Sequence, residues 1–189
     1  MRAAILLAIL FALLPVRAQA HPHVFIQYLI EPQIKDGAIA SVVLKWRFDD
    51  LYSSLVLGTI DRDGDGKLSQ PEIDDLAARV IVNTAESGFY TTFKLDGVEW
   101  RAPKADGFTA SASDEIVTYA FTIVLPKPAR ALEASAHDPQ YYIALEADPK
   151  QPDVGNGAVA CRLGKPETVK DKTWGDYMRD VVSCEAKAK

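Results

Sequence analysis

The stretch SVVLKWRFDDLYSSLVLGTIDRDGDGKLSQPE, residues 41–72, passes from one hydrophobic period to another. In its first part Val42, Leu44, Trp46 and Phe48 fall on one face of an extended chain, which is the pattern of a half-buried strand. The rest has helical spacing, which resumes after an aspartate-rich loop. This order predicts a β structure interrupted by a helix–loop–helix hairpin.

Strand patterns lie on both sides of this hairpin. Upstream, HVFIQYLIEPQI is rich in β-branched and aromatic residues and is followed by a turn at Asp36-Gly37. Downstream, YTTFKLDGVEW predicts a hairpin closing at Asp96-Gly97, EIVTYAFTIVLP, YYIALEA and GAVACRL predict further strands, and TWGDYMRDVV predicts a short helix. We expect one mainly β domain, residues 21–189, built as an antiparallel β-sandwich with an EF-hand-like insertion at residues 49–87.

The first twenty residues have the pattern of a secretory signal peptide. Arg2 precedes an apolar run from Ala3 to Leu14, and Ala18-Gln19-Ala20 provides a small-residue cleavage site. The run is too short to cross a membrane, which takes about 20 apolar residues. We expect cleavage before His21 and a periplasmic or secreted protein that does not itself span the membrane.

Charge and cysteine content narrow the function classes. The formal net charge is −5, which argues against nucleic acid as a partner and suits the attraction of cations. The two cysteines, Cys161 and Cys184, are predicted to form a disulfide, as is common in exported proteins. A pair of soft metal ligands is the alternative, although their spacing matches no zinc pattern.

The loop DRDGDGKLSQPE, residues 61–72, matches the complete EF-hand calcium pattern. Calcium takes six to eight oxygen ligands, and the loop offers them at fixed positions. Gly66 stands at the position where the pattern requires a glycine for the sharp turn. The predicted calcium ligands, with Lys67 acting through its carbonyl, are Asp61, Asp63, Asp65, Lys67, Ser69 and Glu72.

A helix start also explains part of this loop. Ser69, Pro71 and Glu72 fit an N-cap, a first-turn proline and a capping box. The capping box leaves the three aspartates unexplained, and carboxylates so close together repel one another unless a cation neutralises them. Calcium is therefore favoured. Because only one such loop is found and methionine is scarce, a structural calcium is favoured over a sensor.

Cleavage before His21 would create a second candidate metal site. A terminal histidine offers its α-amine and its ring nitrogen, and His23 adds another imidazole, a ligand that suits nickel, cobalt, zinc and copper. His137 and Asp138 are further candidates. Two exposed histidines that bind nothing specific are an equally good interpretation of the residues alone.

Four segments resemble a known family: HPHVFI, WRFDDLYSSLVLGTIDRDGDGKLS, DGVEW and DPQYYIAL. The chain is similar to bacterial periplasmic proteins of a domain-of-unknown-function family, described as periplasmic components of uncharacterised ABC-type transport systems. Their genes often lie beside nickel/cobalt-type permeases. The resemblance implies an accessory role in transition-metal handling, with a membrane permease as a partner, and it favours Asp138 over His137 as a ligand.

Together these features predict a non-enzymatic periplasmic metal-binding accessory protein that serves metal transport or homeostasis. Two alternatives stay open. One is a calcium-dependent interaction module for a membrane transporter. The other is a copper enzyme that uses the N-terminal histidine, although His23 lies closer in sequence than a second ligand from a distant strand would, and no nucleophile–base motif is found.

Overall fold

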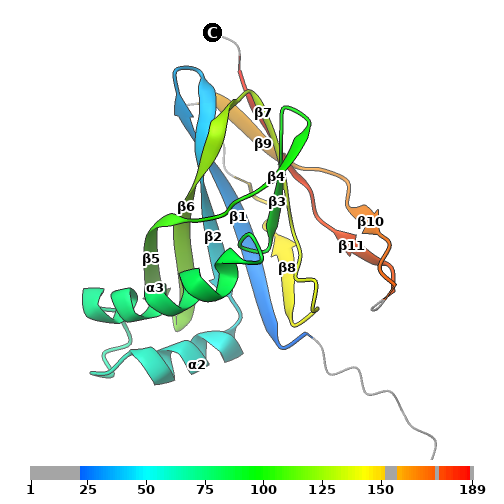
Figure 1. Cartoon of the computed structure of the whole chain (residues 1–189). Helices are drawn as coiled ribbons and strands as arrows, with labels where there is room; N and C mark the ends of the chain where they lie inside the picture. Colours follow the sequence, from blue (N-terminus) through cyan, green and yellow to red (C-terminus); the bar gives the residue numbers. More distant parts are fainter. Residues whose placement is uncertain (1–21, 152–156, 173–174, 188–189) are drawn as a thin grey trace, which may run out of the picture.

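The computed structural model describes residues 22–151, 157–172 and 175–187, and it places two facing β-sheets with two helices at one end (Figure 1). The expected signal peptide and His21 lie outside the described residues. The first sheet has the order β5-β6-β2-β1-β8. Its strands are β1 (Val24–Lys35), β2 (Ala38–Phe48), β5 (Asp106–Ser113), β6 (Ile116–Ala129) and β8 (Ile143–Ala147).

The second sheet has the order β4-β3-β7-β12-β9. Its strands are β3 (Thr91–Leu95), β4 (Val98–Arg101), β7 (Ala131–Ala136), β9 (Val159–Leu163) and β12 (Val182–Ala186). A separate two-stranded ribbon of β10 (Glu167–Val169) and β11 (Tyr177–Arg179) projects from the side of the sandwich (Figure 1). The mainly β fold with an inserted helical hairpin is thus confirmed.

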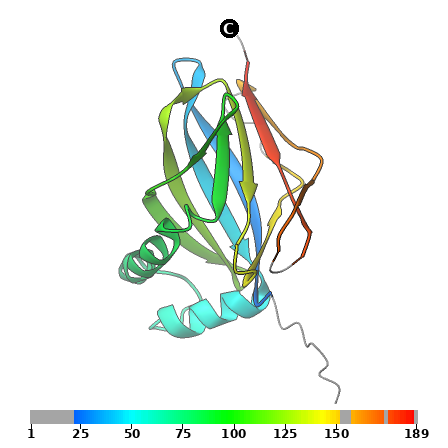
Figure 2. The same ribbon diagram turned by 45° about the vertical axis from the view of Figure 1, so that its right-hand side comes forward.

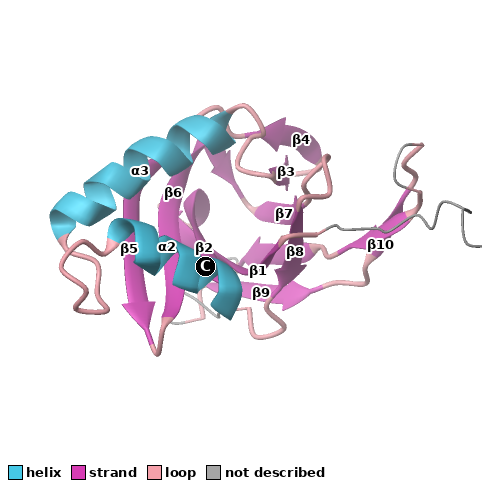
Figure 3. Cartoon of the chain, turned by 90° about the horizontal axis from the view of Figure 1, so that it is seen from below, coloured by secondary structure: helices cyan, strands magenta, loops and turns pink. Residues whose placement is uncertain are grey.

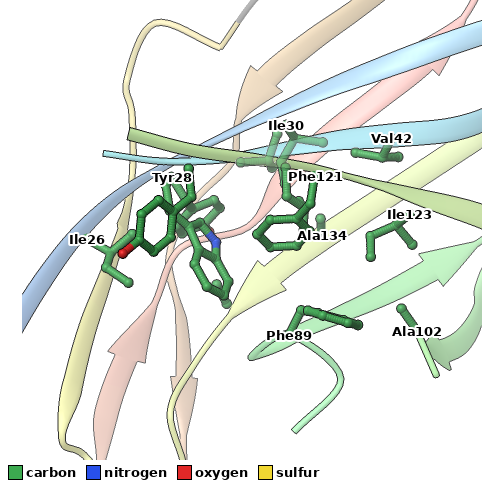
Figure 4. Close-up of a cluster of buried hydrophobic side chains, with 14 of the residues drawn as sticks. Ile26, Tyr28, Ile30, Val42, Phe89, Ala102, Phe121, Ile123 and Ala134 are labelled. Carbon is green, nitrogen blue, oxygen red and sulfur yellow. The ribbon is translucent and has the colours of Figure 1, made fainter. Parts of the chain in front are cut away.

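The core lies between the two sheets, and Figure 2 shows them as facing layers. The alternation of β2 places Val42, Leu44 and Trp46 in this core, each 2% exposed or less. Figure 4 shows how Phe121 and Ala134, from opposite sheets, both point into this interior. Large side chains buried from both layers supply most of the favourable free energy of such a sandwich.

The helices are α2 (Asp50–Ile60) and α3 (Gln70–Ala85), and they cross one end of the sandwich (Figure 3). Asp49 fixes the start of α2, because its carboxylate accepts a hydrogen bond from Tyr52 N and another from Phe25 N, both at 2.7 Å. Ser53 is fully buried, and its Oγ accepts the Val117 N–H of β6 at 3.0 Å. The hairpin is therefore anchored to the first sheet by two side chains.

Two details differ from the sequence-based expectations. β8 pairs with β1 in parallel, so the sandwich is not wholly antiparallel. The segment around Tyr177 is the strand β11 and not a helix, because Tyr177–Arg179 pairs with Glu167–Val169. The predicted disulfide Cys161–Cys184 is confirmed, and it joins directly opposed residues of the neighbouring strands β9 and β12.

Candidate metal centre

The loop between α2 and α3 is held at both ends by buried or half-buried side chains. Ile60 is 3% exposed at the end of α2, and Leu68 packs against the core from within the loop. Between them the chain turns sharply at Gly64 and Gly66, whose φ angles are +71° and +76°. These left-handed conformations favour glycine because a Cβ would be strained there.

Carboxylate oxygens of Asp61, Asp63 and Asp65 lie within 4.8 Å of one another. The loop wraps around Asp61, whose Oδ1 accepts the Gly64 N–H at 2.8 Å and whose Oδ2 accepts the Gly66 N–H at 2.9 Å. Two ligand oxygens around one calcium ion, each 2.3–2.6 Å from it, are at most about 5 Å apart. The spacing of the three carboxylates therefore fits one shared cation.

Electrostatic strain is concentrated on Asp63. The backbone N–H of Asp65 lowers the pKa of Asp63, but the negative charge of the Asp65 carboxylate and the contact with Asp61 act the other way and prevail, so the pKa of Asp63 lies above its ordinary value. Arg62, the neighbouring cation, is directed away, because its guanidinium pairs with Asp75 at 3.0 Å. The triad is thus a site where a cation would relieve repulsion.

Glu72 has a different environment from the triad. It is 4% exposed, and its two oxygens accept hydrogen bonds from Arg62 N at 2.7 Å, Ser69 N at 2.8 Å and Ser69 Oγ at 2.7 Å. These donors, Arg62 N first, lower the pKa of Glu72. Here Glu72 completes the start of α3 and is not grouped with the aspartates.

The donor set suits a hard cation. Carboxylate oxygens, a backbone carbonyl at Lys67 and a hydroxyl at Ser69 are all oxygen ligands, which calcium and magnesium prefer over transition metals. A glycine-hinged loop matches the flexible coordination of calcium better than the rigid octahedron of magnesium. Bidentate binding by Glu72 would use the same two oxygens that accept the hydrogen bonds from Arg62 and Ser69.

The histidine candidates are not grouped in the same way. His23 is exposed at the start of β1, where its ring centroid lies 4.8 Å from that of Tyr142. His137 stacks on Tyr177 at 4.1 Å, and burial lowers the pKa of its imidazole. Among the described residues, no cluster of three His, Cys, Asp or Glu side chains includes His23, His137 or Asp138.

Asp138 has a structural role in this fold. It is 4% exposed, its Oδ1 accepts the Gln140 N–H at 2.9 Å, and its Oδ2 accepts the N–H groups of Tyr142 and Ile143 at 3.0 Å. These bonds shape the turn that leads into β8. The Asp-Pro pair in this segment is the sequence signal for such a turn.

Sequence reasoning missed the residues that position the metal loop. Asp49 and Ser53 hold α2 against the first sheet, and neither was predicted to have a role. For Asp49 a signal was present, because an aspartate directly before a helical pattern is a good N-cap. No local signal marks Ser53, since its partner Val117 is distant in sequence.

Fold and loop together define a β-sandwich protein with an EF-hand-like insertion. The model of the family described as "Protein of unknown function (DUF1007)" matches residues 6–187, so the chain belongs to this family. It is also similar to an uncharacterised protein of Haemophilus influenzae, with 24% identity over 133 residues. That match covers 67% of this chain and 62% of the relative, so the chain spans less than two thirds of the relative's length.

No helix among the described residues is long and apolar enough to cross a membrane. The disulfide between Cys161 and Cys184 is of the kind found mainly outside the cytoplasm, where thiols are not kept reduced.

Proposed function

We propose that this protein is a periplasmic, non-enzymatic metal-binding accessory protein with calcium in the loop of residues 61–72. The observation that carries the proposal is the convergence of Asp61, Asp63 and Asp65 on one small volume. Bound calcium would supply positive charge, and the three carboxylates would supply oxygen ligands together with the Lys67 carbonyl. The loop would then brace α2 against α3.

The calcium part is tested by equilibrium dialysis of chelator-treated protein against calcium, followed by metal analysis. The double variant Asp61→Asn/Asp63→Asn removes two ligand charges, and Asp36→Asn is the matched control because Asp36 lies in the β1–β2 turn. We expect one calcium per chain in the wild type and the control, and less than half of that in the double variant. Equal calcium in all three proteins would refute the proposal.

A second metal, nickel, cobalt, zinc or copper, is proposed to bind at the mature terminus through His21 and His23. The support is chemical: a terminal amine and imidazoles are ligands of intermediate softness, and His23 is exposed. The test compares transition-metal titration of protein that begins at His21 with protein that carries one extra N-terminal residue. Weaker binding by the extended protein is expected, and equal affinity would exclude a role for the terminal amine.

The proposed biological role is metal transport or homeostasis, in which a membrane metal permease is the partner. A second candidate, a calcium-dependent interaction module for such a transporter, is favoured by one observation. Leu51 and Leu55 on α2 are 74% and 63% exposed, which is unusual for leucines on a helix anchored by its other face. If calcium alters permease binding while transition metals do not, the module is the better description.

A further inference from the structure

A cavity of about 390 Å³ lies where the helical hairpin meets the end of the sandwich. Figure 3 shows α2 and α3 crossing this end of the strands. The cavity is lined from both helices and from the ends of β1, β2, β6 and β8. Its volume falls in the lower part of the range of small-molecule sites, roughly 300–1,000 Å³.

The inner wall of this cavity is mainly apolar. Ile26, Phe48, Val56 and Leu76 line it, and each is 6% exposed or less. The first two come from the sandwich and the other two from the helical hairpin. An alkyl chain placed between these side chains would leave water, which is the main driving force for filling such a site.

The mouth of the cavity is marked by the exposed residues of its lining. These are Leu55 and Thr59 on α2, Arg79 and Asn83 on α3, and Tyr142 before β8. Residues four positions apart lie on the same face of a helix, so each helix contributes one edge of the mouth. A ligand whose chain lies inside can therefore keep a polar head group in contact with water between the helices.

Arg79 is the one charged side chain among the described residues that line the cavity. Its Nη2 pairs with Asp75 Oδ2 at 3.0 Å, and Arg62 pairs with the same oxygen, also at 3.0 Å. One carboxylate thus offsets only one of the two positive charges. A guanidinium has five N–H donors, and the Arg79 side chain is 59% exposed, so a ligand at the mouth can reach donors that Asp75 does not use.

We propose that this cavity binds an aliphatic carboxylate, with its alkyl chain between the hairpin and the sandwich and its carboxylate paired with Arg79 at the mouth. An anionic head group complements the positive charge that Asp75 leaves over, whereas a cationic head group would be repelled. The inference does not depend on calcium binding, because none of the described lining residues belongs to the loop of residues 61–72.

Three probes with an unbranched chain of similar length separate the head-group charges: octanoate, 1-octanol and octyltrimethylammonium. Binding to calcium-free protein is followed through the methyl signals of Val56 and Leu76, well below the concentrations at which the probes form micelles. Leu132 is the internal control, since it is buried in the second sheet and does not line the cavity. We expect octanoate to shift the Val56 and Leu76 signals saturably and to bind most tightly, and octyltrimethylammonium to bind most weakly. Absence of these shifts with octanoate, or equally tight binding of either other probe, would overturn the proposal.

The chain length of the carboxylate tests whether the interior is used. Each methylene group buried contributes the equivalent of about a fourfold gain in affinity. Heptanoate and hexanoate should therefore bind about fourfold and about sixteenfold more weakly than octanoate to the wild-type protein. An affinity that does not depend on chain length would show that only the head group is bound, and it would overturn the proposal.

Arg79→Gln tests the head-group contact, since it removes the positive charge and keeps a long polar side chain. We expect octanoate to bind about fivefold more weakly, the upper range for one exposed ion pair, and octanol binding to change less than about twofold. Arg162→Gln is the matched control, because Arg162 is also an exposed arginine and pairs with Glu185, but it lies on β9. It should leave octanoate binding unchanged. Undiminished octanoate affinity in Arg79→Gln, or an equal loss for octanol, would overturn the role of Arg79.

Discussion

Two aspartate-bearing turns of this protein differ in chemistry. Asp138 is a single buried carboxylate whose oxygens are taken up by three backbone N–H groups. In the other turn, carboxylates of Asp61, Asp63 and Asp65 crowd together near the surface. Asp63 there has a raised pKa in spite of a backbone donor. A buried carboxylate whose oxygens accept several backbone N–H hydrogen bonds has a structural role. A cluster of carboxylates whose negative charge exceeds what nearby N–H groups can stabilise is suited to binding a cation.

The largest effect is expected from Asp138→Ala. Three backbone donors around a buried site would lose their acceptor, and we expect a loss of about 3 kcal/mol in the free energy of unfolding. Urea denaturation measures it. Asp148→Ala is the control, because its half-buried carboxylate accepts a single hydrogen bond, from Lys150 N–H, among the described residues. A loss no larger than that of the control would contradict the structural assignment of Asp138.

Asp65→Asn should have the next largest effect, and only when calcium is present. Loss of one ligand charge is expected to weaken calcium binding at least about tenfold, or about 1.4 kcal/mol. Melting temperature with and without calcium measures this, since a ligand that binds only the folded state stabilises it. The calcium-dependent rise should shrink in Asp65→Asn and persist in Asp36→Asn. If calcium raises the melting temperature of Asp65→Asn as much as that of the wild type, the ion binds elsewhere.

A smaller effect is expected in the pH dependence of stability that Glu72 contributes. Because its folded-state pKa lies below the ordinary value of 4.5, the Glu72 carboxylate stabilises the calcium-free protein above that pH. This contribution is lost as pH falls below 4.5 through the lowered pKa. The stability difference between wild type and Glu72→Gln should therefore be constant from neutral pH down to about 5 and shrink below it.

In the same experiment, Asp63→Asn should change stability in the opposite direction from Glu72→Gln. A raised folded-state pKa means that the Asp63 carboxylate is destabilising when charged, and this penalty disappears as pH falls through that pKa. Without calcium, Asp63→Asn should be the more stable protein at neutral pH, and its advantage should fade in acid. Parallel pH profiles for the two variants would contradict the distinction between Glu72 and Asp63.

The smallest effect is expected at the surface next to the loop. Asp75 pairs with Arg62 and Arg79 at 3.0 Å, and all three side chains are partly exposed. Exposed pairs of this kind contribute roughly 0–1 kcal/mol, so Asp75→Asn should change the free energy of unfolding by about 0.5 kcal/mol or less. Urea denaturation in low and high salt measures it. A loss as large as that of Asp138→Ala would show that this network organises the loop.

Local patterns in the sequence were sufficient for much of this structure. Strict alternation in β2 and β6 and the Asp-Gly turn at Asp96-Gly97 are local signals, and the structure follows them. The EF-hand-like loop could be recognised for the same reason, since all the residues of its pattern lie within twelve residues.

Features that depend on distant parts of the chain could not be predicted. The parallel pairing of β8 with β1 depends on which edge is available once the rest of the sheet has formed. The short strand β11 exists because β10 pairs with it, and no periodicity over three residues can reveal this. Asp138 is a different case, because its three N–H donors lie within five residues of it and the Asp-Pro pair signals the turn. Its role as a metal ligand was favoured by the family resemblance and stays a prediction.

The most direct test of the account is calcium titration of chelator-treated, ¹⁵N-labelled protein, followed through glycine amide signals. Gly64 and Gly66 donate to Asp61 within the loop, while Gly37 lies in the distant β1–β2 turn. We predict that the Gly64 and Gly66 signals shift and reach saturation at one equivalent of calcium while the Gly37 signal does not move. Unchanged Gly64 and Gly66 signals at saturating calcium would contradict a calcium site in this loop.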